Sequence, residues 1–224
     1  MIKKLIAAVL ILLLLLLVIN IAKSETYVFG AYWQTFETSG EKTPIEWYIL
    51  DENQSSLLLI SKYSLDANVF NHTEYTTWEN SQMRQFLNTY FYDNAFCEAE
   101  KARIILSPIE TLPNTVYAST DQGPRTQDFV FLLSVQEVEK YSFPRVALAT
   151  GFARLGHKRI IGDKWAGAYT SPITGATCWR LRTMGIDNLH VTNVRADGTI
   201  SYSGDVLFAP HYAIRPCIWI KKDE

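Results

Sequence analysis

The sequence predicts an α+β fold built on a small, twisted, mostly antiparallel sheet, and three observations predict this class. Strand and helix signals occur in separate blocks along the chain, whereas a doubly wound parallel sheet would need them to alternate. Pairs of apolar runs are joined by short polar turns, as in antiparallel hairpins. Two long segments, 109–126 and 143–176, have no regular pattern. Loops of this length are often functional, so we expect a binding site on loops.

The composition is that of one globular domain. The chain has 224 residues, 48% of them hydrophobic and 20% charged, which excludes a disordered, collagen-like or disulfide-framework polypeptide. The first 24 residues hold three of the 21 basic groups and no acid, which leaves 18 basic against 23 acidic groups in residues 25–224. An acidic domain without a block of Lys or Arg lacks the surface that binds nucleic acid, so no such partner is expected.

The first 24 residues have the pattern of an export signal. A short basic start precedes an unbroken apolar run, and residues 5–22 would form a helix of about 27 Å, close to the thickness of a bilayer core. Ala22-Lys23-Ser24 matches a small-x-small cleavage site, so a cleaved signal peptide and an uncleaved membrane anchor both remain open. Either one predicts an extracytoplasmic location for a single domain of residues 25–224, secreted or held at the outer face of the cytoplasmic membrane.

The first half begins with strands and continues with helices. Residues 27–33 are aromatic and β-favouring, and the apolar runs 46–50 and 57–61 flank a polar loop, which predicts a hairpin. A helix is predicted next, because Thr76 opens a capping-box pattern ahead of apolar residues at helical spacing. A short second helix is predicted over 97–104, where acidic residues fill the first turn.

The second half has one short helix between strands. The apolar run 129–133 is predicted to be a strand. Ser134 and Glu137 then form a second capping box, which predicts a helix to about residue 141. Alternating side chains over 177–183 predict a further strand.

The chain closes with a hairpin and a last strand. Asp197-Gly198 lies between the strand-like runs 191–195 and 200–202, and this dipeptide is a strong hairpin signal. The last strand is predicted over 214–220. Pro216 confines it to a sheet edge or a bulge, because proline cannot donate to a sheet ladder.

A series of motifs follows one order along most of residues 27–222. They are Pro44-Ile45-Glu46-Trp47-Tyr48-Ile49-Leu50-Asp51, Leu58-Leu59-Ile60-Ser61, Thr77-Trp78-Glu79-Asn80-Ser81, Phe131-Leu132-Leu133-Ser134, Trp179-Arg180-Leu181-Arg182 and Ile214-Arg215-Pro216. As an ordered set they resemble the bacterial family known as domain of unknown function 6273. The chain departs from the family at Cys178-Trp179, where a double Trp is usual.

The resemblance implies a setting and a fold more than an activity. Members of this family look like exported or surface-associated proteins, often of gut Gram-positive bacteria. The late Trp-x-Leu-Arg strand and the closing Arg-Pro strand are also similar to patterns in the C-type-lectin-like and formylglycine-generating-enzyme fold. The resemblance therefore implies a C-type-lectin-like arrangement with two or three short helices and a loop-rich C-terminal half, although a shared fold does not imply a shared function.

Two cysteines raise an enzymatic alternative. Cys178 and Cys217 each lie in an apolar, strand-like context, and they are too far apart to form the closely spaced pair that oxidation of the formylglycine type needs. Buried cysteines are usually inert, so we interpret both as structural, either as core thiols or as one bridge between strands. The sequence has no cysteine–histidine cluster at metal-ligand spacing, and no metal or cofactor is predicted.

Two arginines are candidate ligand-binding residues. Alternation along the predicted 177–183 strand places Arg180 and Arg182 on one face. An unpaired buried guanidinium is costly, so each arginine either recognises an anionic ligand or forms an internal ion pair, with Asp187 and Asp205 as the carboxylates in question.

Arg215 and Asp205 are assigned a structural role. Arg215 is flanked by apolar residues in the closing strand. We interpret it as a tie between the loop-rich half and the sheet.

Aromatic and polar residues near the second long segment complete the candidate site. Trp165, Tyr169 and Trp179 lie in or beside this segment, and Asp187-Asn188 follows in the next loop. Flat sugar faces stack on aromatic rings while sugar hydroxyls bind carboxylates and amides. This combination predicts a platform for a carbohydrate or a peptide.

These observations favour a non-enzymatic, extracytoplasmic binding module. Its ligand would be a glycan, a cell-wall component or a surface protein, held by the loops around 162–172 and 184–189. Two alternatives remain open: a thiol-dependent enzyme of the formylglycine-generating fold that uses Cys178 or Cys217, and a structural envelope protein without a small ligand.

Overall fold

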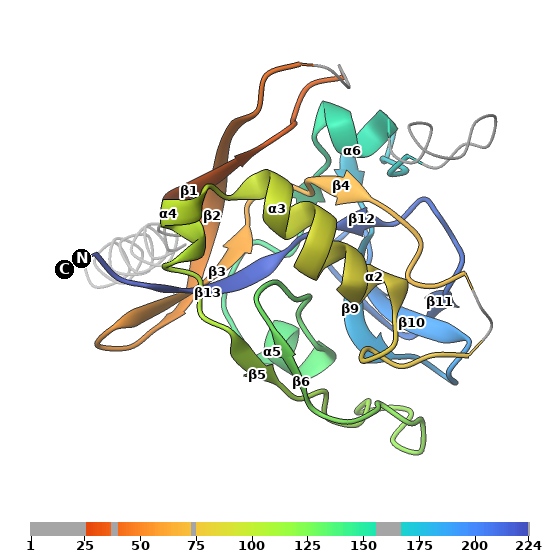
Figure 1. Ribbon diagram of the computed structural model, residues 1–224. Helices are drawn as coiled ribbons and strands as arrows, with labels where there is room; N and C mark the ends of the chain where they lie inside the picture. The colour runs from red at the N-terminus through yellow and green to blue at the C-terminus, as the bar shows by residue number, and fades with distance from the viewer. Residues whose placement is uncertain (1–25, 37–39, 73–74, 156–166, 224) are drawn as a thin grey trace, which may run out of the picture.

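The strands form two main sheets. The computed structural model describes residues 26–36, 40–72, 75–155 and 167–223. One sheet, called here the first sheet, has four antiparallel strands in the order β1, β2, β3 and β13. Their bounds are Thr26–Tyr32, Thr43–Glu52, Ser56–Ser61 and Cys217–Lys221. The chain therefore returns at its end to pair with an early hairpin (Figure 1).

The second sheet belongs largely to the C-terminal third. Its order is β11, β10, β9, β12 and β4, and all neighbours are antiparallel except β12 and β9. Their bounds are Ile200–Val206, His190–Val194, Trp179–Met184, Ala213–Ile214 and Asp66–Ala67. Two small antiparallel pairs add β5 with β6 (Ser107–Ile109, Thr126–Asp128) and β7 with β8 (Ala147–Leu148, Ala176–Thr177).

Short helices cover these sheets. A continuous rod of α2, η1 and α3 crosses in front of them in Figure 1, with bounds Gln82–Phe86, Leu87–Phe91 and Tyr92–Ala95. The middle segment is a π-helix, which is rare in proteins. The other described helices are α4 (Glu98–Lys101), α5 (Val135–Lys140) and α6 (Gly151–Leu155). The predicted α+β class with mostly antiparallel pairing is confirmed.

One cluster of buried side chains joins both sheets. It includes Trp47 and Leu59 of the first sheet and Leu181 and Val191 of the second. In β3 the four residues from Leu57 to Ile60 are all buried, so both faces of this strand are covered. Removal of this apolar surface from water is the main favourable contribution to the folded state.

Three predicted elements differ from the structure. The first long helix begins at Ser81, whose hydroxyl accepts from the Arg84 N–H; the Thr76 hydroxyl instead contacts the neighbouring Thr77 carbonyl. Residues 129–133 contain only an isolated bridge, between Phe131 and Cys217, because the run bends into the cap of α5.

The closing strand is divided at Pro216. β12 ends before this proline and belongs to the second sheet, whereas β13 begins after it and forms an edge of the first sheet. Because proline has no N–H, the ladder stops there, and the chain crosses from one sheet to the other.

The predicted leader lies outside the described residues. Among residues 26–36, 40–72, 75–155 and 167–223, no helix is long and apolar enough to cross a bilayer. The expected signal peptide or anchor in residues 1–24, with its apolar stretch 5–22, therefore stays a prediction.

Candidate functional site

A cleft opens on the second sheet beside the β10–β11 hairpin. This hairpin lies at the right of Figure 1. It consists of one hollow of about 510 Å³ and another of about 320 Å³, and both are lined by Cys178 and Tyr212. We call this pair of hollows the Cys178 cleft. Its size is within the range of small-ligand sites.

The larger hollow has a polar wall. The hairpin supplies the Asn193 amide, the Ser201 and Ser203 hydroxyls and the Asp205 carboxylate, and Arg195 and Asp197 stand at its turn. Ser201, Ser203 and Asp205 occupy alternate positions of β11, and all three line this hollow.

The hairpin turn is fixed by its own side chain. Asp197 Oδ1 accepts hydrogen bonds from the Thr199 N–H at 2.9 Å and from its hydroxyl at 2.7 Å, and these bonds lower the pKa of Asp197. Gly198 follows with a φ of 86°, a conformation that favours glycine. The predicted Asp-Gly hairpin is confirmed, and its turn holds the rim of the cleft in place.

A second glycine brings β11 close to β10. Gly204 has a φ of 75°, and a Cβ there would lie 2.5 Å from the Val191 carbonyl oxygen. The strand register shifts at this point, between Val191 and Asn193. Such a bulge redirects the side chains that follow it, and here Asp205 comes to line the cleft.

The smaller hollow has an aromatic wall. It is lined by Tyr169, His211 and Tyr212 together with Cys178. Tyr169 is 55% exposed, and its backbone is held on both sides, by its N–H to the His211 carbonyl and by the Thr177 hydroxyl to its own carbonyl. A ring is thus presented to solvent from a fixed backbone.

Tyr212 connects the cleft to a buried cation. Its hydroxyl donates a short hydrogen bond to the Asp205 carboxylate, and burial together with this bond raises the pKa of Tyr212. Beneath its ring, 3.9 Å from the ring centre, lies the guanidinium of Arg180. An arginine over an aromatic face is a favourable cation–π contact.

Arg180 is fully buried and donates to backbone carbonyls. The acceptors include Val206 at 2.8 Å and Asp205 and Ala209 at 3.2 Å. Burial lowers the pKa of Arg180 to about 10, so it stays charged at neutral pH. The predicted ion pair with the Asp205 carboxylate is not formed: that carboxylate accepts from Tyr212, and Arg180 reaches Asp205 through its backbone carbonyl.

Arg182 and Arg215 also point into the protein. Arg182 is 2% exposed and forms two hydrogen bonds to the Glu137 carboxylate, at 2.5 and 3.0 Å. Arg215 donates to the carbonyls of Ser61 and Pro144 and lies 4.9 Å from the Trp179 ring centre. All three guanidinium groups are therefore buried against protein atoms, although the Arg180 Nε has no hydrogen-bond partner among the described residues.

The prediction that Asp187, in the 184–189 loop, pairs with a buried arginine is wrong. Asp187 pairs with His190 at 2.6 Å, three residues along its own turn, and this bond lowers the pKa of Asp187. Asn188 is buried, and its amide donates to the carbonyls of Thr76 and Asp121. These two residues stabilise the loop and do not line the Cys178 cleft.

The three candidate aromatics have different positions. Tyr169 lines the cleft, and Trp165 lies outside the described residues. Trp179 is fully buried and donates its indole N–H to the Arg145 carbonyl. It does not form an exposed platform, because its ring belongs to the core.

All three cysteines are free thiols, so Cys178 and Cys217 form no bridge. Cys217 is buried, and burial raises its pKa well above 9.0. Cys178 is partly exposed in the cleft, and burial raises the pKa of its thiol as well, although the Ala196 N–H and Arg195 act against this. A raised pKa favours the less nucleophilic thiol form.

Sequence reasoning missed most residues of the polar wall. A signal was present, because Ser201, Ser203 and Asp205 alternate directly after a recognised hairpin turn. His211 and Tyr212 gave no local signal, since only the pairing of β12 with β9 brings them beside Cys178.

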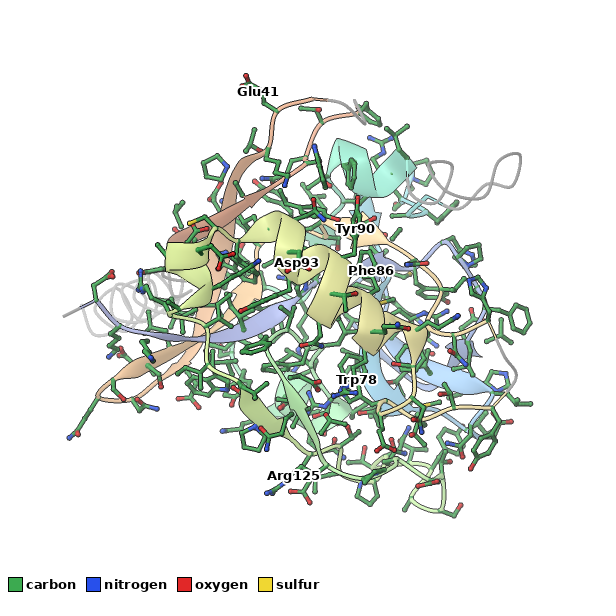
Figure 2. All side chains as sticks on the ribbon, viewed as in Figure 1. Glu41, Trp78, Phe86, Tyr90, Asp93 and Arg125 are labelled. Carbon is green, nitrogen blue, oxygen red and sulfur yellow. The ribbon has the colours of Figure 1, made fainter. Side chains whose placement is uncertain are left out.

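A separate hollow of about 320 Å³, which we call the α2–η1 hollow, lies along the rod of α2 and η1. It is lined by the amides of Asn68, Gln82 and Gln85 and by the rings of Phe86 and Tyr90, which stack with centres 5.6 Å apart. Figure 2 shows these two rings on the rod. The thiol, carboxylates and guanidiniums that distinguish the Cys178 cleft have no counterpart in its lining.

Metal binding finds no support in the part of the chain that the structure describes. There, no three side chains of His, Cys, Asp or Glu are grouped closely enough to hold an ion.

Comparison with known proteins identifies a family whose description gives no function. Neither a curated protein nor a solved structure matches the chain. One family model matches residues 54–222, which include both sheets except for β1 and β2. The matched region also contains every described residue of the Cys178 cleft. The chain therefore belongs to the family described as Domain of unknown function (DUF6273).

Proposed function

We propose that this protein is a non-enzymatic, extracytoplasmic binding module whose Cys178 cleft recognises a glycan of the cell surface. The observation that carries the proposal is the composition of the cleft. Hydroxyl, amide and carboxylate groups line one hollow, an exposed tyrosine lines the other, and the two hollows share Cys178 and Tyr212. Sugars present both hydroxyl groups and flat apolar faces, and such a mixed surface binds both.

The positions of the polar groups support a binding role. Asp197 and Asp205 each already accept hydrogen bonds from neighbouring groups, so their carboxylates are oriented before a ligand arrives. Groups that need no rearrangement lower the entropy cost of binding. The leader pattern of residues 1–24 supports an extracytoplasmic site, and the mostly antiparallel, loop-rich architecture supports the proposed likeness to C-type lectins.

Tyr169 provides the most direct test. The full chain, kept in a mild detergent, is applied to a bacterial glycan array and to purified peptidoglycan, as wild type and as Tyr169→Ala. Loss of the stacking face should weaken binding at least about tenfold. Tyr75→Ala is the matched control, because Tyr75 is also an exposed tyrosine, at 64%, but does not line the cleft. An equal effect of the two substitutions, or no retention of the wild type, would contradict the proposal.

A thiol-dependent enzyme is the second candidate, because Cys178 lines both hollows. A nucleophilic thiol is normally ionised by a neighbouring base or cation, and burial acts in the opposite direction at Cys178. Alkylation with iodoacetamide at pH 7 distinguishes the candidates. The binding module predicts that exposed Cys97 reacts first, Cys178 more slowly and buried Cys217 last. Selective, rapid alkylation of Cys178 would favour the enzyme.

A further inference from the structure

The Cys178 cleft and the layer beneath it carry two negative and two positive side chains. Asp197 and Asp205 contribute two carboxylates to its wall, and Arg195 contributes one guanidinium. The second guanidinium is that of Arg180, directly beneath the Tyr212 ring. A buried charge at this distance acts strongly on the cleft, since little water lies between them to screen it.

The two cations differ in their access to a ligand. Arg180 is covered by Tyr212 and donates to the carbonyls of Asp205, Val206 and Ala209, so it contributes charge but no direct contact. Arg195 is exposed at the rim, where its guanidinium lies 3.3 Å from the Ser201 hydroxyl and its charge lowers the pKa of Asp197. An acidic sugar would find one accessible guanidinium, with carboxylates beside it.

His211, Cys178 and Tyr212, which also line the cleft, are neutral at pH 7. Burial and the nearby Arg180 charge lower the pKa of His211 below 6.5, so its imidazole is uncharged. The raised pKa values of Cys178 and Tyr212 keep both side chains protonated. These groups can donate or accept hydrogen bonds without changing the charge balance.

We infer that the cleft selects an uncharged, hydroxyl-bearing sugar and discriminates against acidic and amino sugars. This inference rests on the proposed function and narrows it. An acidic sugar would bring a third negative charge next to Asp197 and Asp205, and an amino sugar would bring a third positive charge above Arg180. Either one would also lose part of its hydration shell, and the opposite charge that it could reach has a like charge beside it: Asp197 stands next to Arg195, and Arg195 next to Asp197.

The inference predicts an order of affinities for matched sugars. Galactose oligomers are compared with galacturonate oligomers, which carry a carboxylate on each unit. N-acetylglucosamine oligomers are compared with glucosamine oligomers, which carry an ammonium group. Titration calorimetry with the full chain in mild detergent should show that the neutral member of whichever pair binds is favoured at least about tenfold. Its Kd should change less than about twofold between 50 and 500 mM salt, because no net charge is neutralised on binding.

Two single substitutions should each reduce this selectivity for one pair of sugars. Asp197→Asn removes one negative charge but keeps the Oδ1 acceptor that holds the turn, and we expect the galacturonate disadvantage to shrink severalfold. Arg195→Gln removes the exposed cation, and the glucosamine disadvantage should shrink instead. Glu98→Gln and Arg125→Gln are the matched controls, because both residues are exposed and lie outside the cleft lining. Neither control should change the ratio.

The outcomes separate the inference from the proposed function. Tighter binding of a charged sugar, or a steep dependence of Kd on salt, would overturn the inference and leave a glycan-binding cleft. The inference would also be overturned if the cleft variants and their controls changed the ratio of charged-sugar to neutral-sugar Kd equally. No binding of any of the four sugars, together with no retention on the array, would overturn both.

Discussion

The two sheets are both buried, but they are held together in different ways. β3 of the first sheet places the consecutive apolar residues Leu57 to Ile60 in the core. β9 of the second sheet buries Arg180 and Arg182 among its apolar residues. The first sheet is stabilised by apolar packing and by ladder bonds, which run without a register shift between β3 and β13. The second also relies on buried guanidinium groups: Arg182 reaches the carbonyls of Glu110 and Leu132, which lie outside the strands, and Arg180 reaches carbonyls at the end of β11.

This difference changes how the arginines are interpreted. Arg182 donates to carbonyls of Glu110 and Leu132 as well as to the Glu137 carboxylate. Arg215 likewise links its own strand region to Pro144 and Ser61. A planar group with five donors satisfies several buried carbonyls at once. Arg180, which lies beneath Tyr212, is the buried arginine that supports a wall of the Cys178 cleft.

The largest effect on stability is expected for Arg182→Met. The substitution leaves the Glu137 carboxylate, whose side chain is 26% exposed, without its cation, and it leaves buried carbonyls without a donor. Loss of one partner of a buried ion pair costs about 3–5 kcal/mol. Urea unfolding measures the change. Arg125→Met, whose side chain is 61% exposed, should cost less than about 0.5 kcal/mol, and a similar result for Arg182→Met would remove the distinction between the sheets.

Leu59→Ala is the corresponding change in the first sheet. Leu59 is fully buried in β3, so its truncation should cost about 3 kcal/mol through lost burial and the cavity left behind. The comparison is sharpened by repeating both measurements at acid pH. The cost of Leu59→Ala should stay constant, whereas that of Arg182→Met should shrink as Glu137 becomes protonated. Parallel pH profiles would show that the two cores respond alike.

Acid should destabilise the second sheet, where Arg182 pairs with Glu137, before it destabilises the first sheet. Burial raises the pKa of Glu137, but the charge and hydrogen bonds of Arg182 and the bond from Ser134 outweigh it, and the net pKa lies below 4.5. A lowered pKa stabilises the folded state above 4.5, and this stabilisation is lost as pH falls through the folded-state pKa. Glu137→Gln should therefore flatten the decline of stability below pH 4.5. If Glu137→Gln loses stability below pH 4.5 as steeply as the wild type, Glu137 is not the group that causes this loss.

The smallest predicted effect concerns the cap of α5. The Ser134 hydroxyl accepts from the Glu137 N–H, and the Glu137 carboxylate accepts from the Ser134 N–H at 2.7 Å. Ser134→Ala should cost about 1 kcal/mol in thermal or urea unfolding. Ser55→Ala, at an exposed loop position, serves as the control and should be nearly neutral. Equal costs would mean that the cap does not contribute measurably.

Local patterns predicted local structure well in both regions. Asp197-Gly198 indicated its hairpin, and Ser134 with Glu137 indicated a capped helix, because the interacting groups are a few residues apart. The same Glu137 also pairs with Arg182, which is 45 residues away. No pattern within either segment specifies that pairing, since it depends on how the sheet packs against α5.

The misplaced helix start has a similar cause. Thr76 and Ser81 both offer a capping hydroxyl, and the sequence pattern favours Thr76. The structure uses Ser81, while the backbone and side-chain amide of Asn188 bond to the Thr76 backbone. A contact between residues 112 positions apart therefore keeps Thr76 outside the helix. Long-range contacts of this kind also assemble the Cys178 cleft, where Cys178, Asp205 and Tyr212 come from separate elements.

Hydrogen exchange with and without a bound sugar compares the two regions most directly. The full chain, in mild detergent, is saturated with the neutral oligosaccharide that binds most tightly, and exchange is followed by mass spectrometry. We predict slower exchange in peptides that cover residues 193–205 and 211–212, with residues 56–61 unchanged. Protection confined to the first sheet or to the α2–η1 hollow, with no change around Cys178, would contradict the assignment of the ligand to the second sheet.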